Sequence, residues 1–392
     1  MKIAIICSNF VSITKDVKKG TEIFDHILIN NLAKADKNLD ITAFASGDSN
    51  LPVKIESIDY HPAILDKSII QKDKHVIFEL ALISRAFSKQ DNFDLYHINI
   101  GDGDIALPFA PFVKKPLLIT LHYTQEAEYI DKYFSLFSSY KNVSFVSISN
   151  AQRNFFPDLN YAGTIYHGIE TETFKFDSKG GESIIWAGRG VPDKGLNIVF
   201  QILKKIQRKA RIFPLKKQEH IAWLNKQVAD LKDLMPSQDV FIEFDKDRFE
   251  LVNHYQLGRL FLFPIQWEEP FGLVLIESMA CGTPVVAFAR GSVPEIVKDG
   301  KTGFIVNPAE TDIRGDWVIK KTGIDGLCEA IEKIYSMPEK EYQKMRQNCR
   351  SLVEKSFSAD KMAKEYMNVY RKIVLSNHSI LRSPTVLTIK AL

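Results

Sequence analysis

The stretch Glu269-Pro-Phe-Gly-Leu-Val-Leu-Ile-Glu277 decides the fold and suggests a reaction. An apolar strand, Leu260–Ile265, precedes it, and a helix follows that Gly282 and Pro284 would end. A strand that turns at Gly272 and feeds a helix directs backbone N–H groups at one point, which is an anion site. The flanking carboxylates accept hydrogen bonds from hydroxyls. Phosphate on one side and hydroxyls on the other describe a nucleotide-sugar.

Composition narrows the class of protein. The 392 residues suggest two or three domains, and a content of 45% hydrophobic and 25% charged residues is ordinary for a globular protein. A net charge of +3 argues against nucleic acid as the main partner. The four cysteines are scattered and form no C-x-x-C pair, which indicates buried thiols in a reducing compartment. No run has the length of a membrane span. We expect a cytoplasmic protein, with peripheral contact at the inner membrane face left open.

Apolar runs of strand length alternate with amphipathic helical stretches along the whole chain. Such alternation predicts parallel sheets with helices on both faces. A polar, glycine-containing segment, Thr171–Ser183, separates two such series, and ligands are expected at the carboxyl ends of the strands, in the cleft between the lobes. The predicted strands are Ile3–Cys7, Ile41–Ala45, Leu95–Ile100, Leu117–His122, Val143–Ile148, Thr164–Tyr166, Ile184–Ala187, Val240–Phe244, Leu260–Pro264, Val285–Ala289 and Gly303–Val306. The predicted helices include Thr21–Ala35, Leu196–Gln207, His220–Leu234, Ile324–Ser336, Glu339–Glu354 and Ala359–Ile373.

Two cations follow the first strand of the second series. In Gly188-Arg-Gly-Val-Pro-Asp-Lys194 a strand ends, and Arg189 and Lys194 flank a short loop before a helix. Two cations near one helix N-terminus can hold a diphosphate and stabilise it as it departs. An ordinary charged surface loop is the alternative, and the glutamate motif in the same lobe favours the functional interpretation.

The glutamate motif resembles the retaining glycosyltransferases of family four, whose hallmark is two glutamates separated by seven residues. Gly291-Ser-Val-Pro-Glu295 and Asp299-Gly-Lys-Thr-Gly303 are also similar to that family. Further similar blocks are Lys19-Gly-Thr-Glu22, Phe44-Ala-Ser-Gly-Asp48, Val146-Ser-Ile-Ser-Asn-Ala-Gln152 and Tyr166-His-Gly168. The resemblance runs to Tyr370 and implies the GT-B fold, two Rossmann-like doubly wound lobes facing a cleft. It divides the chain into an acceptor lobe, 1–172, a donor lobe, 173–356, a helix returning to the first lobe, 357–374, and a tail, 375–392.

The resemblance also assigns roles to residues. Glu277 would accept the ribose hydroxyls and Glu269 the sugar hydroxyls, while Arg189 and Lys194 hold the donor phosphates. The backbone of Phe271, Gly272, Leu273 and Val274 would hold sugar and phosphate oxygens. Gly20, where Lys19 replaces a second glycine common in the family, would lie against the phosphates, and His122 would contact the sugar or acceptor near the reacting carbon. His97, His167 and Glu295 are weaker candidates, and Lys216 would lie near the donor.

The implied activity is transfer of a hexose from UDP-hexose or GDP-mannose to a hydroxyl of a glycan, glycolipid or small molecule. No cofactor or metal is implied, because the nucleotide-sugar is a substrate and cations replace the metal. One rival is an inactive binding protein on the same fold. The other is an NAD-dependent oxidoreductase, suggested only by Gly101-Asp-Gly-Asp-Ile-Ala106.

Two further patterns have competing interpretations. The pairs Asp102/Asp104 and Asp245/Asp247 are of the type that binds a metal–diphosphate in single-lobed transferases, and the two-lobed pattern argues against that interpretation. Seven Lys or Arg residues between Lys204 and Lys217 favour a solvated helix face over an anionic lipid or a charged acceptor.

Overall fold

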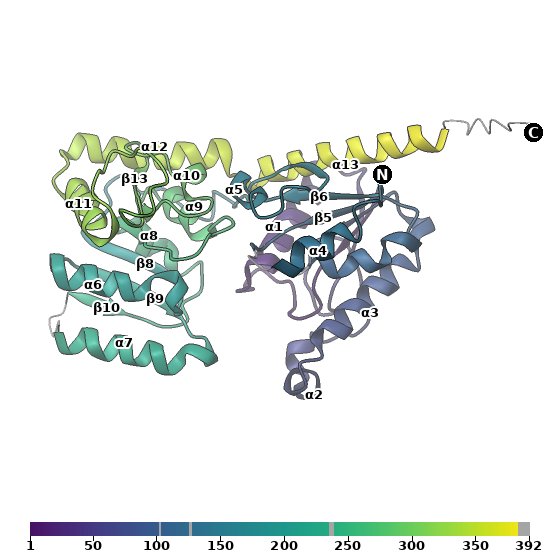
Figure 1. The fold of residues 1–392 in the computed structure, drawn as a ribbon, viewed down its shortest axis with the longest axis horizontal. Helices are drawn as coiled ribbons and strands as arrows, with labels where there is room; N and C mark the ends of the chain where they lie inside the picture. The colour runs from purple at the N-terminus through teal and green to yellow at the C-terminus, as the bar shows by residue number, and fades with distance from the viewer. Residues whose placement is uncertain (102, 125–127, 235–238, 383–392) are drawn as a thin grey trace, which may run out of the picture. The chain divides into compact units, whose positions relative to one another are not determined.

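The computed structural model describes residues 1–101, 103–124, 128–234 and 239–382, which form two compact units (Figure 1). Unit 1 consists of Met1–Ile148, Phe156–Ile165 and the residues from Met362 onward. Unit 2 consists of Ser149–Phe155 and Tyr166–Lys361. The segment Thr171–Ser183 therefore lies inside unit 2, where Phe174 is buried and the Arg346 guanidinium donates hydrogen bonds of 3.0 and 2.9 Å to the Asp177 carbonyl.

Unit 1 is built on a seven-stranded parallel sheet in the order β3-β2-β1-β4-β5-β6-β7. Its strands are β1 (Lys2–Ile6), β2 (Asp40–Phe44), β3 (Lys54–Glu56), β4 (Leu95–Ile98), β5 (Leu117–Thr120), β6 (Val143–Ser147) and β7 (Tyr161–Thr164). Its helices are α1 (Gly20–Ala35), α2 (Lys67–Gln71), α3 (His75–Phe87) and α4 (Glu128–Ser135). The strand order reverses between β1 and β4, which makes their carboxyl ends a ligand-binding edge.

Unit 2 is built on a six-stranded parallel sheet in the order β10-β9-β8-β11-β12-β13. The strands are β8 (Ser183–Arg189), β9 (Ala210–Leu215), β10 (Val240–Ile242), β11 (Gly258–Phe263), β12 (Val285–Phe288) and β13 (Gly303–Val306). The helices are α5 (Asn150–Arg153), α6 (Leu196–Ile206), α7 (Ile221–Leu234), α8 (Leu251–Gln256), α9 (Leu273–Ala280), α10 (Val293–Ile296), α11 (Gly323–Tyr335) and α12 (Glu339–Ser356). The order reverses between β8 and β11, the two strands that carry the cations and the glutamate motif.

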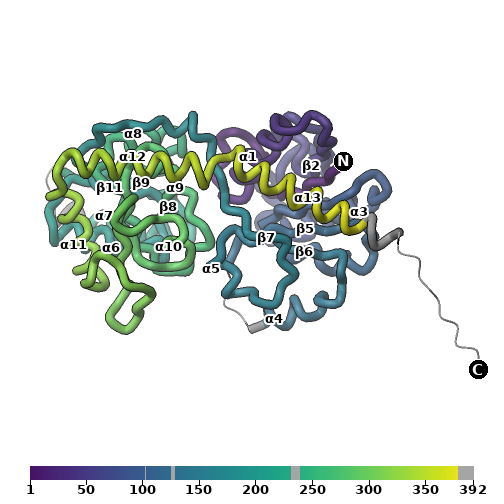
Figure 2. The backbone as a smooth tube through the Cα atoms, turned by 90° about the horizontal axis from the view of Figure 1, so that it is seen from above, coloured from purple at the N-terminus to yellow at the C-terminus, as the bar shows by residue number. Residues whose placement is uncertain are grey.

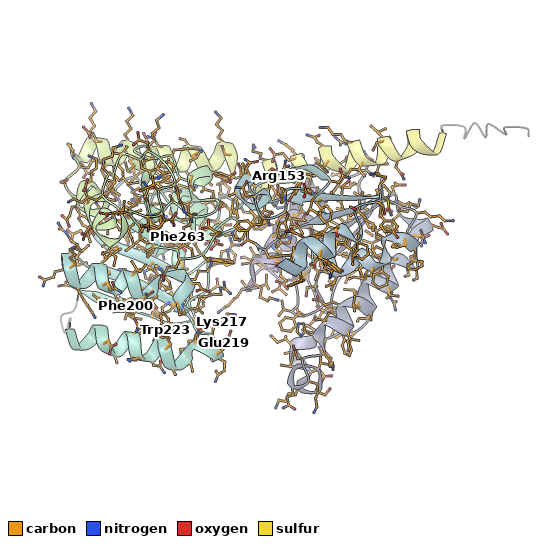
Figure 3. All side chains as sticks on the ribbon, in the orientation of Figure 1. Arg153, Phe200, Lys217, Glu219, Trp223 and Phe263 are labelled. Carbon is orange, nitrogen blue, oxygen red and sulfur yellow. The ribbon has the colours of Figure 1, made fainter. Side chains whose placement is uncertain are left out.

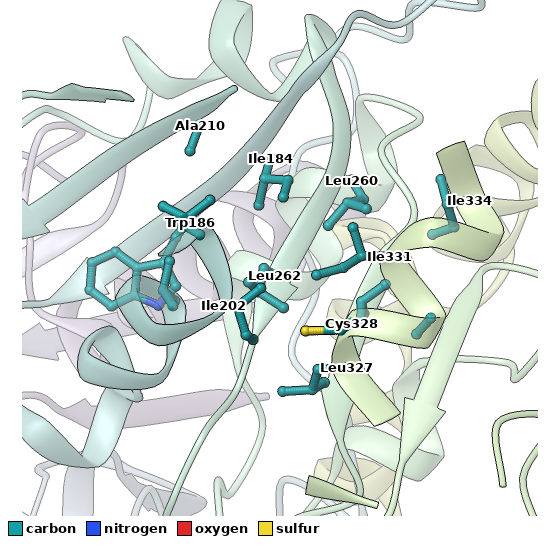
Figure 4. Packing of buried hydrophobic residues seen from close by; sticks show 14 of the residues in the cluster. Ile184, Trp186, Ile202, Ala210, Leu260, Leu262, Leu327, Cys328, Ile331 and Ile334 are labelled. Atoms are coloured by element: carbon teal, nitrogen blue, oxygen red, sulfur yellow. The ribbon is translucent and has the colours of Figure 1, made fainter. Parts of the chain in front are cut away.

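Alternation along β11 explains why helices cover both faces of this sheet. Leu260 and Leu262 pack with Ile202 of α6 and Ile331 of α11 in a buried cluster (Figure 4). Phe261 points to the opposite face, because successive side chains of a strand alternate, and its ring lies 5.8 Å from that of Tyr255 in α8. On the first face α6 and α7 lie next to each other and carry Phe200 and Trp223 (Figure 3).

The last helix, α13 (Ala359–Arg382), packs along the sheet of unit 1 (Figure 2). Tyr370 Oη lies 2.6 Å from Nδ1 of His97 in β4, and Tyr366 Oη lies 3.0 Å from the Thr120 hydroxyl in β5. His97 Nε2 lies 2.7 Å from the same hydroxyl, which completes a buried hydrogen-bonded network.

The predicted fold class, two doubly wound α/β lobes, is confirmed. The last predicted helix, Ala359–Ile373, is longer in the structure, where α13 continues to Arg382. The physical reason is that Val374–Arg382 contains neither Gly nor Pro, so nothing in its sequence ends the helix. The rest of the predicted tail lies outside the described residues.

Candidate active site

The loops after β8 and β11 meet backbone to backbone at the point where the strand order of unit 2 reverses. Gly195 has φ +74°, and a Cβ on it would stand 2.0 Å from the Pro264 carbonyl oxygen. The Gln266 N–H donates to the Asp193 carbonyl at 2.9 Å. This close approach requires glycine at position 195, and it brings the cation loop and the glutamate loop together.

Lys194 and Glu269 form an ion pair across these two loops. Lys194 Nζ lies 2.5 Å from Glu269 Oε2, and both side chains are almost fully buried. Trp267 donates its indole N–H to the same oxygen at 2.9 Å, and its ring lies 4.6 Å below the ammonium group. Two separate sequence patterns predicted Lys194 and Glu269 as site residues, but neither pattern indicated that Trp267 contacts both.

Burial governs the protonation chemistry of Lys194. Desolvation lowers the pKa of its ammonium group, while the Glu269 carboxylate acts in the opposite direction and the positive charge of Arg189 adds to the lowering. Arg189 itself is exposed at the carboxyl end of β8. The site thus places one buried and one exposed cation next to a strand-reversal point, where a diphosphate would find both charges.

The turn between the two glutamates has the conformation that its sequence predicts. Gly272 has φ +86° and stands directly before α9, and no side chain in the described part of the chain caps that helix. The Phe271 carbonyl accepts a hydrogen bond of 2.7 Å from the Ser292 hydroxyl. A helix start without a side-chain cap leaves first-turn N–H groups, here those of Leu273 and Val274, available to an anion.

Glu277 lies in α9 and pairs with an arginine that sequence analysis missed. Arg248 donates from Nε at 3.0 Å and from Nη2 at 2.6 Å, both to Glu277 Oε1. Arg248 belongs to a mixed-charge loop without a recognisable motif, so only the structure places it here. Burial, and then the negative charge of Glu277, raise the pKa of the Tyr255 hydroxyl well above its usual range.

A second missed group, Glu268, fixes the loop that carries Glu269. Its carboxylate accepts hydrogen bonds from the Gly291 N–H at 2.7 Å and from Arg290 at 3.1 Å, and it pairs with Arg314 at 2.7 Å. Asp312 bridges the same two arginines, at 3.1 Å from Arg290 and 2.7 Å from Arg314. A network of four alternating charges therefore supports the glutamate loop from behind.

Gly20 and His122, the other predicted site residues, lie in unit 1. Gly20 begins α1, and apart from its chain neighbours and its own helix backbone no described heavy atom lies within 4 Å of the place where a Cβ would stand. His122 follows β5 at the carboxyl edge of the sheet, and its ring lies 4.8 Å from that of Phe24. Burial lowers the pKa of His122 to about 3, so the imidazole is neutral at pH 7.

The weaker candidates have structural contacts. His97 belongs to the buried network that fixes α13. Glu295 accepts hydrogen bonds from the backbone N–H groups of Asn150 and Ala151 at 2.8 and 2.7 Å and from the Tyr166 hydroxyl at 2.7 Å. The ring of His167 packs on that of Phe271 at 5.0 Å.

The remaining patterns are also accounted for. The segment after Gly101 forms a 3-10 helix, Gly103–Phe112, rather than the α-helix that a dinucleotide loop requires, and Asp102 lies outside the described residues. Asp245 pairs with Lys216 at 3.5 Å, and Asp247 accepts from the Phe249 N–H. Within the basic stretch, Arg208 pairs with Glu332 and Lys209 with Glu182, as expected of a solvated face. No helix among the described residues is long and apolar enough to cross a membrane.

Comparisons with known proteins show which family and which fold the chain resembles. Residues 169–352 match the family model "Glycosyl transferases group 1". The chain is 25% identical over 233 residues to spore coat protein SA of Bacillus subtilis, a match that covers 53% of this chain and 58% of that protein, so it spans less than two thirds of that relative.

Two solved structures share the fold over nearly their whole length. The sucrose-phosphate synthase of Thermosynechococcus elongatus has a TM-score of 0.74 at 19% identity, with 96% of this chain and 99% of that chain covered. The Anabaena protein HepE, solved in complex with UDP and glucose, has a TM-score of 0.69 at 18% identity, with 95% and 100% covered. Residues 169–352 thus resemble the group 1 glycosyl transferases, and the chain has the GT-B fold of these two structures.

Proposed function

We propose that this protein is a glycosyltransferase that moves a hexose from a nucleotide-diphosphate sugar, UDP-hexose or GDP-mannose, to an acceptor hydroxyl with retention of the anomeric configuration. The observation that carries the proposal is the meeting of Lys194, Glu269 and the start of α9 at the strand-reversal point of unit 2. HepE, which shares the fold, was solved with UDP and with UDP-glucose, and this supports a uridine nucleotide as the first donor to test.

Each residue of the site has a chemical role in this proposal. The diphosphate binds Arg189 and Lys194 and the uncapped N–H groups of α9, which stabilise the charge that develops as the sugar–phosphate bond breaks. Glu269 accepts hydrogen bonds from sugar hydroxyls, and Glu277 from the ribose. The acceptor oxygen bonds to the anomeric carbon, and its proton leaves with the nucleoside diphosphate. Positive side chains thereby do the work that a divalent metal does in other transferases.

The acceptor is a glycan, glycolipid or small molecule in this proposal. Unit 1 contains a hollow of about 410 Å3 at the carboxyl edge of its sheet, and it is lined by polar groups of Asn9, Asp59, His61 and Lys67 together with apolar side chains. The Asn9 amide oxygen is buried there and makes no hydrogen bond to any described residue. Such a lining suits a molecule with several hydroxyl groups.

A panel of nucleotide-sugars tests the donor site. Thermal unfolding is measured with UDP-glucose, UDP-galactose, UDP-N-acetylglucosamine and GDP-mannose, each with and without EDTA. One donor is expected to raise the unfolding temperature in both conditions, because a ligand at a hundred times its Kd stabilises by about 2.7 kcal/mol. Glu277→Gln should lose most of this shift. Glu332→Gln, at an exposed ion pair of the same unit, should keep it.

The same samples are then assayed for release of the nucleoside diphosphate. Slow hydrolysis of the stabilising donor without an acceptor distinguishes an enzyme from a protein that only binds. If no donor shifts the wild type, or if the shift disappears with EDTA, the roles given to Arg189 and Lys194 are wrong.

A further inference from the structure

Arg248 is the charged residue in contact with Glu277, although it lies outside the glutamate motif. It precedes α8, and its guanidinium is bonded to Glu277 through two nitrogens, Nε and Nη2. The two side chains are only 13% and 4% exposed. A planar guanidinium with two N–H groups on one oxygen fixes the orientation of that carboxylate.

Two aromatic rings hold the guanidinium itself in place. Its central carbon lies 5.1 Å from the ring centre of Phe174 and 5.4 Å from that of Phe249. Phe174 is fully buried, and the Phe249 N–H is anchored to the Asp247 carboxylate at 2.8 Å. Cation–π contact and burial restrict the rotamers of Arg248, so its position in the site is defined before any ligand arrives.

The two carboxylate oxygens of Glu277 differ in their hydrogen-bond partners. Both hydrogen bonds from Arg248 go to Oε1, and no group in the described residues donates to Oε2. Oε2 is therefore left as the acceptor for a ligand hydroxyl. The guanidinium also balances the negative charge of the carboxylate, which would otherwise repel a diphosphate bound nearby.

We infer that Arg248 is a positioning residue that orients Glu277 for the ribose and so sets the preference for ribonucleotides over deoxyribonucleotides. The inference rests on the proposed function, because it assumes that Glu277 faces the ribose. It extends that proposal to a residue outside the motif and to a measurable selectivity between ligands that differ only at the sugar hydroxyls.

The test compares UDP and GDP with their 2′,3′-dideoxy forms by isothermal titration calorimetry. The wild type is expected to bind one of the two ribonucleotides roughly ten- to a hundredfold more tightly than its dideoxy form, as expected for hydrogen bonds to a charged group. In Arg248→Met this ratio should fall towards one. The loss should come from weaker binding of the ribonucleotide, while the dideoxy form binds nearly as before.

Two variants separate positioning from folding. Arg248→Lys keeps the positive charge but not the planar pair of donors. Its ratio of ribonucleotide to dideoxynucleotide affinity should lie between those of the wild type and Arg248→Met. It also replaces Arg248→Met in the test if the methionine variant does not fold. Arg208→Met is the matched control, because Arg208 pairs with Glu332 at 2.7 Å and lies 4.4 Å over the Tyr335 ring of the same unit. It should leave the ratio unchanged.

The outcomes for this inference and for the proposed function differ. If the wild type binds a ribonucleotide but accepts its dideoxy form equally well, or if Arg248→Met and Arg248→Lys keep the wild-type ratio, the inference is overturned while the donor site stands. Equal weakening of both ligands also overturns it, since Arg248 would then act only through charge. If neither UDP nor GDP binds the wild type, the proposed function fails and the inference with it.

Discussion

The nearly buried charged residues of this site already have hydrogen-bonding and ionic partners within the protein. Lys194 and Glu269 are both nearly buried and neutralise each other, with Trp267 as a second donor to the carboxylate. A nucleotide-sugar that binds both residues must therefore be accommodated by a pair that is already formed. Neither side chain pays the full desolvation cost alone, because each has a partner before the ligand arrives.

A double-mutant cycle measures this pair. Lys194→Met is expected to lower the free energy of unfolding by about 3 kcal/mol, because it leaves the Glu269 carboxylate buried with only the Trp267 N–H. Lys194→Met/Glu269→Gln should lose less than the sum of the single changes, which urea unfolding would show. The control is the exposed pair of Lys205 and Asp325, whose Lys205→Met/Asp325→Asn cycle should give a coupling below about 1 kcal/mol. A coupling at Lys194 no larger than this control would contradict the prediction.

Sequence predicted the residues of this site that lie in a spaced motif, and missed those that reach it through space. Glu269, Glu277 and Lys194 are close to a strand end or a helix start, so the local pattern indicates where they point. Arg248 lies 29 positions before Glu277, and its contact depends on the folding of β11 between them. Whether the predicted residues act as proposed stays a prediction.

Among the elements, α13 depends on a buried polar network for its attachment to unit 1. The His97 imidazole connects Tyr370 of α13 with Thr120 of β5, and Thr120 in turn contacts Tyr366. Burial, with a smaller contribution from the charge of His122, lowers the pKa of His97 to about 3. The ring is therefore neutral at pH 7, and a positive charge on it is disfavoured mainly by burial.

The stability of unit 1 should consequently fall in acid. The unfolded chain takes up a proton on His97 below about pH 6.5, whereas the folded chain does so only near pH 3. This contribution to stability is present above pH 6.5 and is lost as pH falls, by at most about 1.4 kcal/mol per pH unit. Urea unfolding at pH 7.0, 5.5 and 4.5 should show a smaller pH dependence for His97→Gln than for the wild type. His61→Gln, at an exposed histidine, should behave like the wild type; equal slopes for all three proteins would refute the prediction.

The sequence predicted the strands that have a strong hydrophobic pattern. It missed strands whose formation depends on contacts with other parts of the sheet. The strands β1, β2, β5, β12 and β13 agree with prediction within a residue or two. The edge strand β3, with one exposed and two half-buried residues, has no apolar run and forms because it pairs with β2. The strand β9 contains Pro214 within a basic stretch, which obscured its pattern.

At the scale of the whole molecule, each unit has its own sheet and its own buried core. Unfolding should therefore have two separable transitions. Ile83→Ala removes a fully buried side chain of unit 1 and Ile331→Ala one of unit 2, and each should cost about 2–5 kcal/mol in its own unit only. Differential scanning calorimetry should show each variant lowering one transition. The stabilising nucleotide-sugar should raise the transition that responds to Ile331→Ala. A single transition lowered by both variants would contradict this division.

The discontinuous make-up of unit 1 has a consequence for the order of events during synthesis. A ribosome makes the chain from its N-terminus, and domains usually fold in the order in which they emerge. Here the sheet of unit 1 emerges first, but the helix that covers it begins only after residue 358, when the residues of unit 2 have nearly all been made. Until then His97 and Thr120 lack the tyrosine hydroxyls that they bind in the finished protein. Unit 2 is therefore the first unit that can be completed. Until α13 has been made, part of the interior of unit 1 stays exposed to solvent and to chaperones.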